Sequence, residues 1–142
     1  MRKTVSAVLL AALLAALFAG CGLFGGGGGG STYEGQTNIT YPLLPDRETF
    51  PPINVLGEDR KYVQCGVTLE ISDSNLVKEF DEKLHRLHDM VNLLVRNKSL
   101  QELEHPDITV VLAQELVDAV NAEFNTLGVR RAVFSPFSIY TR

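Results

Sequence analysis

The chain has 142 residues and a formal net charge of −4 at pH 7, with 13 Lys and Arg against 17 Asp and Glu. This mild acidity argues against a nucleic-acid-binding protein, because that function depends on clustered basic side chains that neutralise phosphates. It also argues against attachment to anionic lipid head groups through a basic surface.

The N-terminus has the layout of an exported protein. Met1-Arg2-Lys3 is a basic start, residues 5–20 are uncharged and dominated by Ala and Leu, and Ala-Gly precedes Cys21. This predicts a lipoprotein signal peptide over residues 1–21, with Cys21 as the lipidated residue. The alternative is an uncleaved membrane anchor, because the uncharged residues 4–24 would span about 30 Å as a helix. Both put the remaining chain outside the cytoplasm, at the outer face of the cell membrane.

Residues 22–50 are expected to form a flexible linker. Gly25 to Gly30 are six consecutive glycines, and Gly gives up more backbone entropy on ordering than any other residue. Polar and Pro-containing sequence continues to residue 50. The linker either clears the lipid head groups or matches the height of a partner. Gly22 follows Cys21, where enteric inner-membrane lipoproteins carry Asp, so the destination membrane stays open.

Residues 51–142 are expected to form one small domain that begins with two strands. Residues 53–56 read as a short strand, and residues 62–71 alternate between apolar and polar side chains. Alternation with period two indicates one buried and one wet face, hence an antiparallel hairpin. Cys65 falls on the apolar face, so we expect a small buried residue and no internal disulfide.

Two amphipathic helices are predicted next. Cap-forming residues at 72–75 precede an apolar stripe over about 22 residues. Ser99 and Glu102 fit a capping box that starts a short helical turn. Asp107 is expected to cap the second long helix, and Gly128 is expected at its C′ position. The stripe of the first helix is Leu76, Phe80, Leu84, Leu87, Val91 and Leu94; that of the second is Ile108, Leu112, Leu116, Val120 and Phe124.

Residues 129–140 are the expected last strand. Pro136 lacks an N–H, so the strand must be bulged or lie at a sheet edge there. The order ββααβ predicts an α+β fold, in which two main helices pack on one face of a small, mostly antiparallel sheet.

One cluster could carry chemistry. Asp81, His85, His88 and Asp89 recur at helical spacing on one flank of the first helix, and such side chains can bind zinc. A solvated helix flank explains them better, since His105 lies on a distant turn and supplies no third imidazole. We therefore predict no catalytic, cofactor or metal site, and no enzyme. A zinc-dependent enzyme is the weakest alternative.

Four short sequence elements follow one another along the predicted domain. They are Leu87-x-Asp89, Lys98-Ser99 with Leu103, Val120-Asn121, and Val133-Phe134 with Phe137. This order resembles the extracytoplasmic domain of the flagellar basal body-associated FliL family over about residues 53–140. Departures from the family pattern include His85 in place of Pro, Ile108-Thr109 in place of Gly-Lys, and Pro136 in place of an acidic residue. Asn121 is expected to bond a neighbouring carbonyl and fix how its helix enters the last strand.

The resemblance implies a stomatin- or prohibitin-like domain that forms homo-oligomeric rings around flagellar stator units. It implies a non-enzymatic motor accessory that modulates motility from the periplasm, at the basal body. The membrane, through the lipid anchor or N-terminal helix, and the stator and basal-body proteins are the expected partners. The alternative is a general cell-envelope lipoprotein that scaffolds or senses without flagella.

Overall fold

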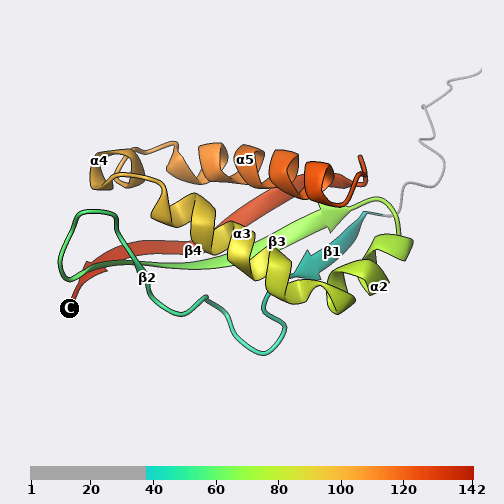
Figure 1. Ribbon diagram of the computed structural model, residues 1–142, viewed down its shortest axis with the longest axis horizontal. Helices are drawn as coiled ribbons and strands as arrows, with labels where there is room; N and C mark the ends of the chain where they lie inside the picture. The colour runs from blue at the N-terminus through green and yellow to red at the C-terminus, as the bar shows by residue number, and fades with distance from the viewer. Residues whose placement is uncertain (1–37) are drawn as a thin grey trace, which may run out of the picture. The chain divides into compact units, whose positions relative to one another are not determined.

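The computed structural model describes residues 38–142, where four strands and four helices form two layers (Figure 1). The strands are β1 (Ile39–Pro42), β2 (Ile53–Asn54), β3 (Lys61–Ile71) and β4 (Val129–Thr141). The helices are α2 (Asn75–Glu82), α3 (Leu84–Arg96), α4 (Leu100–Leu103) and α5 (Ile108–Glu123). All pairings are antiparallel, so the predicted α+β class with a small antiparallel sheet is confirmed.

The sheet is organised around β3. Its N-terminal part pairs with β2 and its C-terminal part with β1 along one edge, while β4 pairs along the whole opposite edge. The apolar residues of β3 all point to the helical layer, as the alternation predicted. They are Val63, Cys65, Val67, Leu69 and Ile71, and each is at most 3% exposed.

The helices cover one face of the sheet, and their apolar stripes form the core with it (Figure 1). Both stripes were predicted, and most of their residues are buried. The ring of Phe80 in α2 packs edge-on against Phe124 at the end of α5, with 4.8 Å between ring centroids. These contacts hold α2, α5 and the sheet together as one core.

The first long helix is not continuous, contrary to the prediction. Lys83 interrupts it with φ −117° and ψ 24°, which separates α2 from α3. The break has a packing reason, because it lets α2 lie over β1. There the Tyr41 hydroxyl donates to Asp81 Oδ1 at 2.7 Å, and the Tyr41 ring packs edge-on against Phe80.

The folded domain begins earlier than expected. Residues 39–50 were assigned to the linker, yet Ile39–Pro42 forms β1, and Leu43 and Phe50 are buried. The backbone N–H groups of Leu43 and Phe50 donate to carbonyls of β3, at Val67 and Cys65. The linker prediction is therefore wrong for this stretch, because its sparse apolar residues complete the core. The predicted order ββααβ lacked this strand. The proposed linker up to residue 37 lies outside the described residues.

Two predicted helix ends differ from the structure. Asp107 occupies the N-cap position of α5, but its side chain makes no capping hydrogen bond. After α5, Asn125 rather than Gly128 adopts a positive φ, of 47°. Gly128 instead enters β4 at a crowded point, where a Cβ would lie 2.4 Å from Leu76 Cδ1. The strand predicted over residues 53–56 is also shorter in the structure, where β2 contains only Ile53–Asn54.

The last strand carries the irregularity that Pro136 predicted. The register between β3 and β4 shifts between Cys65 and Val67, opposite Phe137 and Phe134, so β4 has one extra residue there. The Ser135–Pro136 peptide bond is cis. A second shift, at Glu70–Ile71, leaves Arg130 without a partner on β3. The bulges divide β4 into a proximal part, Arg130–Phe134, and a distal part.

Candidate interaction site

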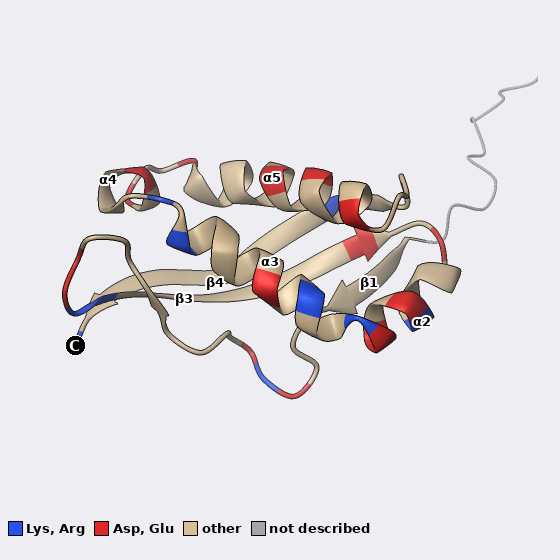
Figure 2. Cartoon of the chain, in the orientation of Figure 1, with Lys and Arg blue, Asp and Glu red and all other residues tan. Residues whose placement is uncertain are grey.

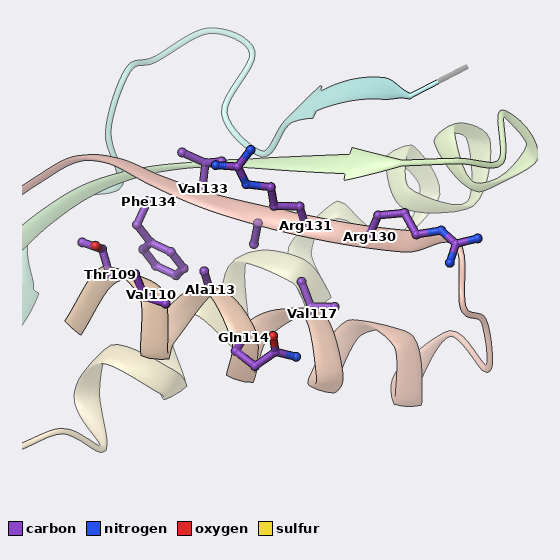
Figure 3. Close-up of a pocket in the computed structure, with 10 residues that line it drawn as sticks. Thr109, Val110, Ala113, Gln114, Val117, Arg130, Arg131, Val133 and Phe134 are labelled. Carbon is purple, nitrogen blue, oxygen red and sulfur yellow. The ribbon is translucent and has the colours of Figure 1, made fainter. Parts of the chain in front are cut away.

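A groove in the described part of the chain lies between α5 and the proximal part of β4. It has a volume of about 310 Å³. One wall is the side of α5 that carries Thr109, Val110, Ala113, Gln114 and Val117; the other is β4 from Arg130 to Phe134. We call this the α5–β4 groove. It exists because β4 is the edge strand and α5 crosses the sheet beside it (Figures 1 and 3).

The floor and the helical wall of this groove are mainly apolar. Phe134 points from β4 toward α5, whereas Arg131 and Val133 point away from it (Figure 3). Val110 is 68% exposed although it is a large aliphatic residue on a helix. Ala113 and Val117 are only partly buried. A helix face that is half-covered in this way leaves apolar surface available to a further segment.

The strand wall is basic. Arg131 Nη1 lies 3.5 Å from Glu70 Oε1, and both side chains remain partly exposed. Arg130 donates from Nε to the Ser72 hydroxyl at 3.3 Å. No carboxylate of the described residues forms an ion pair with Arg130. The groove thus places positive charge on a domain whose helices contain many Asp and Glu residues (Figure 2).

Two other exposed apolar positions cluster elsewhere. Leu56, 65% exposed, and Leu93, 61% exposed, line a shallow pocket with Asp89 and Asn92 on the side of α3. A third hollow, beside α4, is lined in part by Ile108 and Val111. Neither of these two pockets has a strand residue in its lining.

Two of the four candidate zinc residues, Asp81 and His88, make contacts with the segment around β1. His88 Nε2 forms a 2.7 Å hydrogen bond with the Leu43 carbonyl, and its ring packs edge-on against Phe50. Asp81 accepts the Tyr41 hydroxyl, while His85 and Asp89 are exposed. Within residues 38–142, no group of three or more His, Cys, Asp and Glu side chains is arranged to hold a metal ion. The two partly buried hydrogen bonds instead fasten α2 and α3 to the segment around β1.

Two sequence predictions about single residues are confirmed. Cys65 is a free thiol with no exposed surface, and its burial raises its pKa to about 12. Asn121 forms a pair of hydrogen bonds with Val129, donating from Nδ2 to the carbonyl at 3.0 Å and accepting from the amide at 3.1 Å. This bidentate contact fixes the start of β4 against the end of α5. Cys21, the predicted lipidation site, lies outside the described residues.

The turn between α3 and α5 is also fastened as predicted. Ser99 and Glu102 form the capping box, with the Ser99 amide donating to Glu102 Oε2 at 2.8 Å. Lys98 adds an ion pair across the turn, with its Nζ 2.6 Å from Glu115 Oε1 of α5. The Lys-Ser element therefore sets the angle at which α5 follows α3.

The family model of the flagellar basal body-associated protein FliL matches residues 49–139. The chain belongs to the FliL family. The match runs from just before β2 almost to the end of β4, and it leaves out β1. No curated protein matches this chain. The elements that suggested FliL from the sequence are mostly structural, as Lys98, Ser99 and Asn121 show. Membership makes the protein a flagellar basal body-associated one.

Sequence reasoning did not find the α5–β4 groove of this FliL domain. Val110 and Arg130 had no motif to mark them, and their adjacency depends on how α5 lies beside β4. One signal was present: Val110 and Val111 follow Ile108 and cannot all face the core of a single helix. No helix among residues 38–142 is long and apolar enough to cross a bilayer.

Proposed function

We propose that this FliL-family protein is a non-enzymatic accessory of the flagellar motor that associates with stator units and modulates motility. The observation that carries the proposal is the family match over residues 49–139, which covers nearly the whole folded domain. The protein would then act by binding a partner through complementary surfaces, and not through catalytic side chains.

The genetic test is removal of the gene, with the full chain restored from a plasmid as the control. We expect the deletion strain to lose motility under load, seen as slower swarming or slower swimming in viscous medium, and we expect the restored strain to recover. Normal movement of the deletion strain under both conditions would overturn the motor role. That result, in a genome without neighbouring flagellar genes, would favour the general envelope lipoprotein.

We further propose that the domain is anchored through acylated Cys21, with an uncleaved N-terminal helix as the alternative. The supporting pattern is the basic start, the apolar stretch and the small residues before Cys21. Intact mass of the membrane-extracted protein distinguishes the two. A chain that begins at Cys21 and carries added acyl mass supports lipidation, and Cys21→Ser should abolish it. A full-length chain beginning at Met1 would rule lipidation out.

Self-association belongs to the same proposal. A domain of this size buries a modest fraction of its surface, so association would add stability. Analytical ultracentrifugation of the membrane-extracted protein at several concentrations should show species larger than the monomer. A single monomeric species across the range would remove the oligomer from the proposal without touching the motor role.

A further inference from the structure

The outer edge of β4 is not paired with any strand of the described residues. Its other edge pairs with β3. An edge strand presents N–H and C=O groups that can pair with an added strand. Two features limit the usable length. Asn121 already satisfies the backbone of Val129, and Pro136 has no N–H to donate.

The available stretch therefore runs from Arg130 to Ser135. At about 3.4 Å per residue it can pair with about five residues of an extended segment. Such a segment would lie beside β4 and pass along α5, because the α5–β4 groove adjoins this same stretch (Figure 3). Every second side chain of the segment would then face the helix, in contact with Val110, Ala113 and Val117.

The charge of the groove selects the occupant. Arg130 is the bulged residue of β4, it is exposed, and its described hydrogen-bond partner is the neutral Ser72 hydroxyl. Arg131 adds a second guanidinium, which is exposed but pairs with Glu70 and points away from α5 (Figure 3). Asp118 accepts a hydrogen bond from Gln114. No Asp or Glu lines the groove itself. A guanidinium favours carboxylates, which it can bind through two hydrogen bonds.

We propose that the α5–β4 groove binds an extended acidic segment of a partner protein, which joins the sheet as a strand beside β4. Main-chain hydrogen bonds to Arg130–Ser135 supply part of the affinity, and alternate side chains supply the selectivity. Apolar side chains of the segment pack on α5, and its carboxylates meet Arg130, which has no ion-pair partner among the described residues. The assignment of the partner to the flagellar basal body rests on the proposed function. The binding chemistry is independent of that function.

The first test uses the detergent-solubilised full chain and three fluorescent six-residue peptides, measured by fluorescence anisotropy. The probe alternates Glu and Val. A second peptide alternates Lys and Val, and a third is the Glu-Val probe with N-methyl groups on alternate amides, which blocks pairing along one edge. We expect saturable binding of the Glu-Val probe and at least tenfold weaker binding of the other two. Equal binding of all three would overturn the proposal.

The second test changes the groove. Arg130→Gln and Val110→Asp should each weaken binding of the Glu-Val probe at least tenfold, because one removes charge and the other places a carboxylate on the apolar wall. Both residues are exposed, so the variants should unfold at the same denaturant concentration as the parent. Matched controls are Arg47→Gln and Leu93→Asp, exposed positions on other surfaces. Controls that lose as much binding as the groove variants would contradict the assignment.

A third readout separates this inference from the motor role. Cells that carry Arg130→Gln together with Val110→Asp should move like the deletion strain under load. Normal motility of that strain, beside a defective deletion strain, would leave the motor role intact and overturn use of the groove. A different outcome is that the parent fails to bind the peptides while the double variant loses the concentration-dependent assembly of the parent. That pair of results would assign the groove to a second copy of this chain and would also overturn the proposal.

Discussion

At the scale of single residues, Asn121 has the clearest structural task, because its amide satisfies both backbone groups of Val129. Asn121→Ala would leave the N–H and C=O of a buried residue without these partners. We expect a loss of about 1–3 kcal/mol in the free energy of unfolding, measured by urea denaturation. Asn92→Ala, on the half-exposed side of α3, is the control and should change stability little. Equal losses in the two variants would refute the role.

Cys65 leads to a prediction about reactivity. The thiolate is the reactive form, and burial holds the pKa of Cys65 at about 12, so the folded protein keeps it neutral. A thiol reagent such as DTNB should leave Cys65 untouched in native buffer near neutral pH and modify it fully in urea. Because the unfolded chain has the ordinary Cys pKa of 9.0, the titration of Cys65 does not affect the free energy of unfolding below pH 9. As pH rises from 9 toward 12, the unfolded chain loses this proton while the folded protein keeps it, so the free energy of unfolding falls. Rapid labelling of the native domain at Cys65 would show that the core opens there.

At the scale of elements, the capping box of α4 gives a pH-dependent prediction. Hydrogen bonds from the backbone and side chain of Ser99 lower the pKa of Glu102 below its ordinary value of 4.5. A lowered folded-state pKa stabilises the fold above 4.5, and this contribution is lost as pH falls through the lowered value. Glu102→Ala should therefore be less stable than the parent near neutral pH, and the difference should shrink in acid.

The measurement is urea denaturation of parent and variant across the acidic range. Gln101→Ala, its exposed and uncharged neighbour, is the control and should follow the parent at every pH. An NMR titration of Glu102 adds a direct check, because Ser99→Ala should move its pKa back toward the ordinary value. A gap between parent and Glu102→Ala that stays constant with pH would contradict the ionic character of the cap.

The elements show where sequence reasoning succeeds and where it stops. The alternation in β3 and the stripes of the helices were predicted because core burial repeats with the period of each element. The break at Lys83 was missed because Phe80 and Leu84 keep helical spacing across it. β1 was missed because four residues next to prolines carry little periodic signal. Its pairing with β3 is set by tertiary contacts, which the buried Leu43 and Phe50 complete.

At the scale of the whole molecule, the position of the domain boundary can be tested by truncation. A fragment that begins at residue 38 should fold cooperatively, whereas one that begins at residue 51 should not. The shorter fragment loses Tyr41, Leu43 and Phe50, all buried. Removing a large buried side chain costs about 2–5 kcal/mol, and a small domain has only about 5–15 kcal/mol in total. Circular dichroism during thermal unfolding is the measurement. Identical sharp transitions would restore the boundary at residue 50.

The candidate site belongs to this scale as well. Val110 and Arg130 could not be linked from the sequence. The periodicity of a helix or a strand relates only residues within that element, and Arg130 lies in a strand twenty positions after Val110. Their neighbourhood arises when α5 packs beside the free edge of the sheet. The family was recognisable earlier because its pattern consists of residues that hold turns and helix ends, such as Ser99 and Asn121, whose roles are local.

The antiparallel arrangement has a mechanical consequence. Ile39 of β1 pairs with Ile71 at one end of β3, and Thr141 of β4 pairs with Lys61 at the other. The described chain therefore enters the sheet at one pole and leaves it at the opposite pole. Tension applied between these two poles would load the ladder of hydrogen bonds between β1 and β3 in shear, so that all of them resist together. Peeling them apart one at a time would require a sideways pull instead.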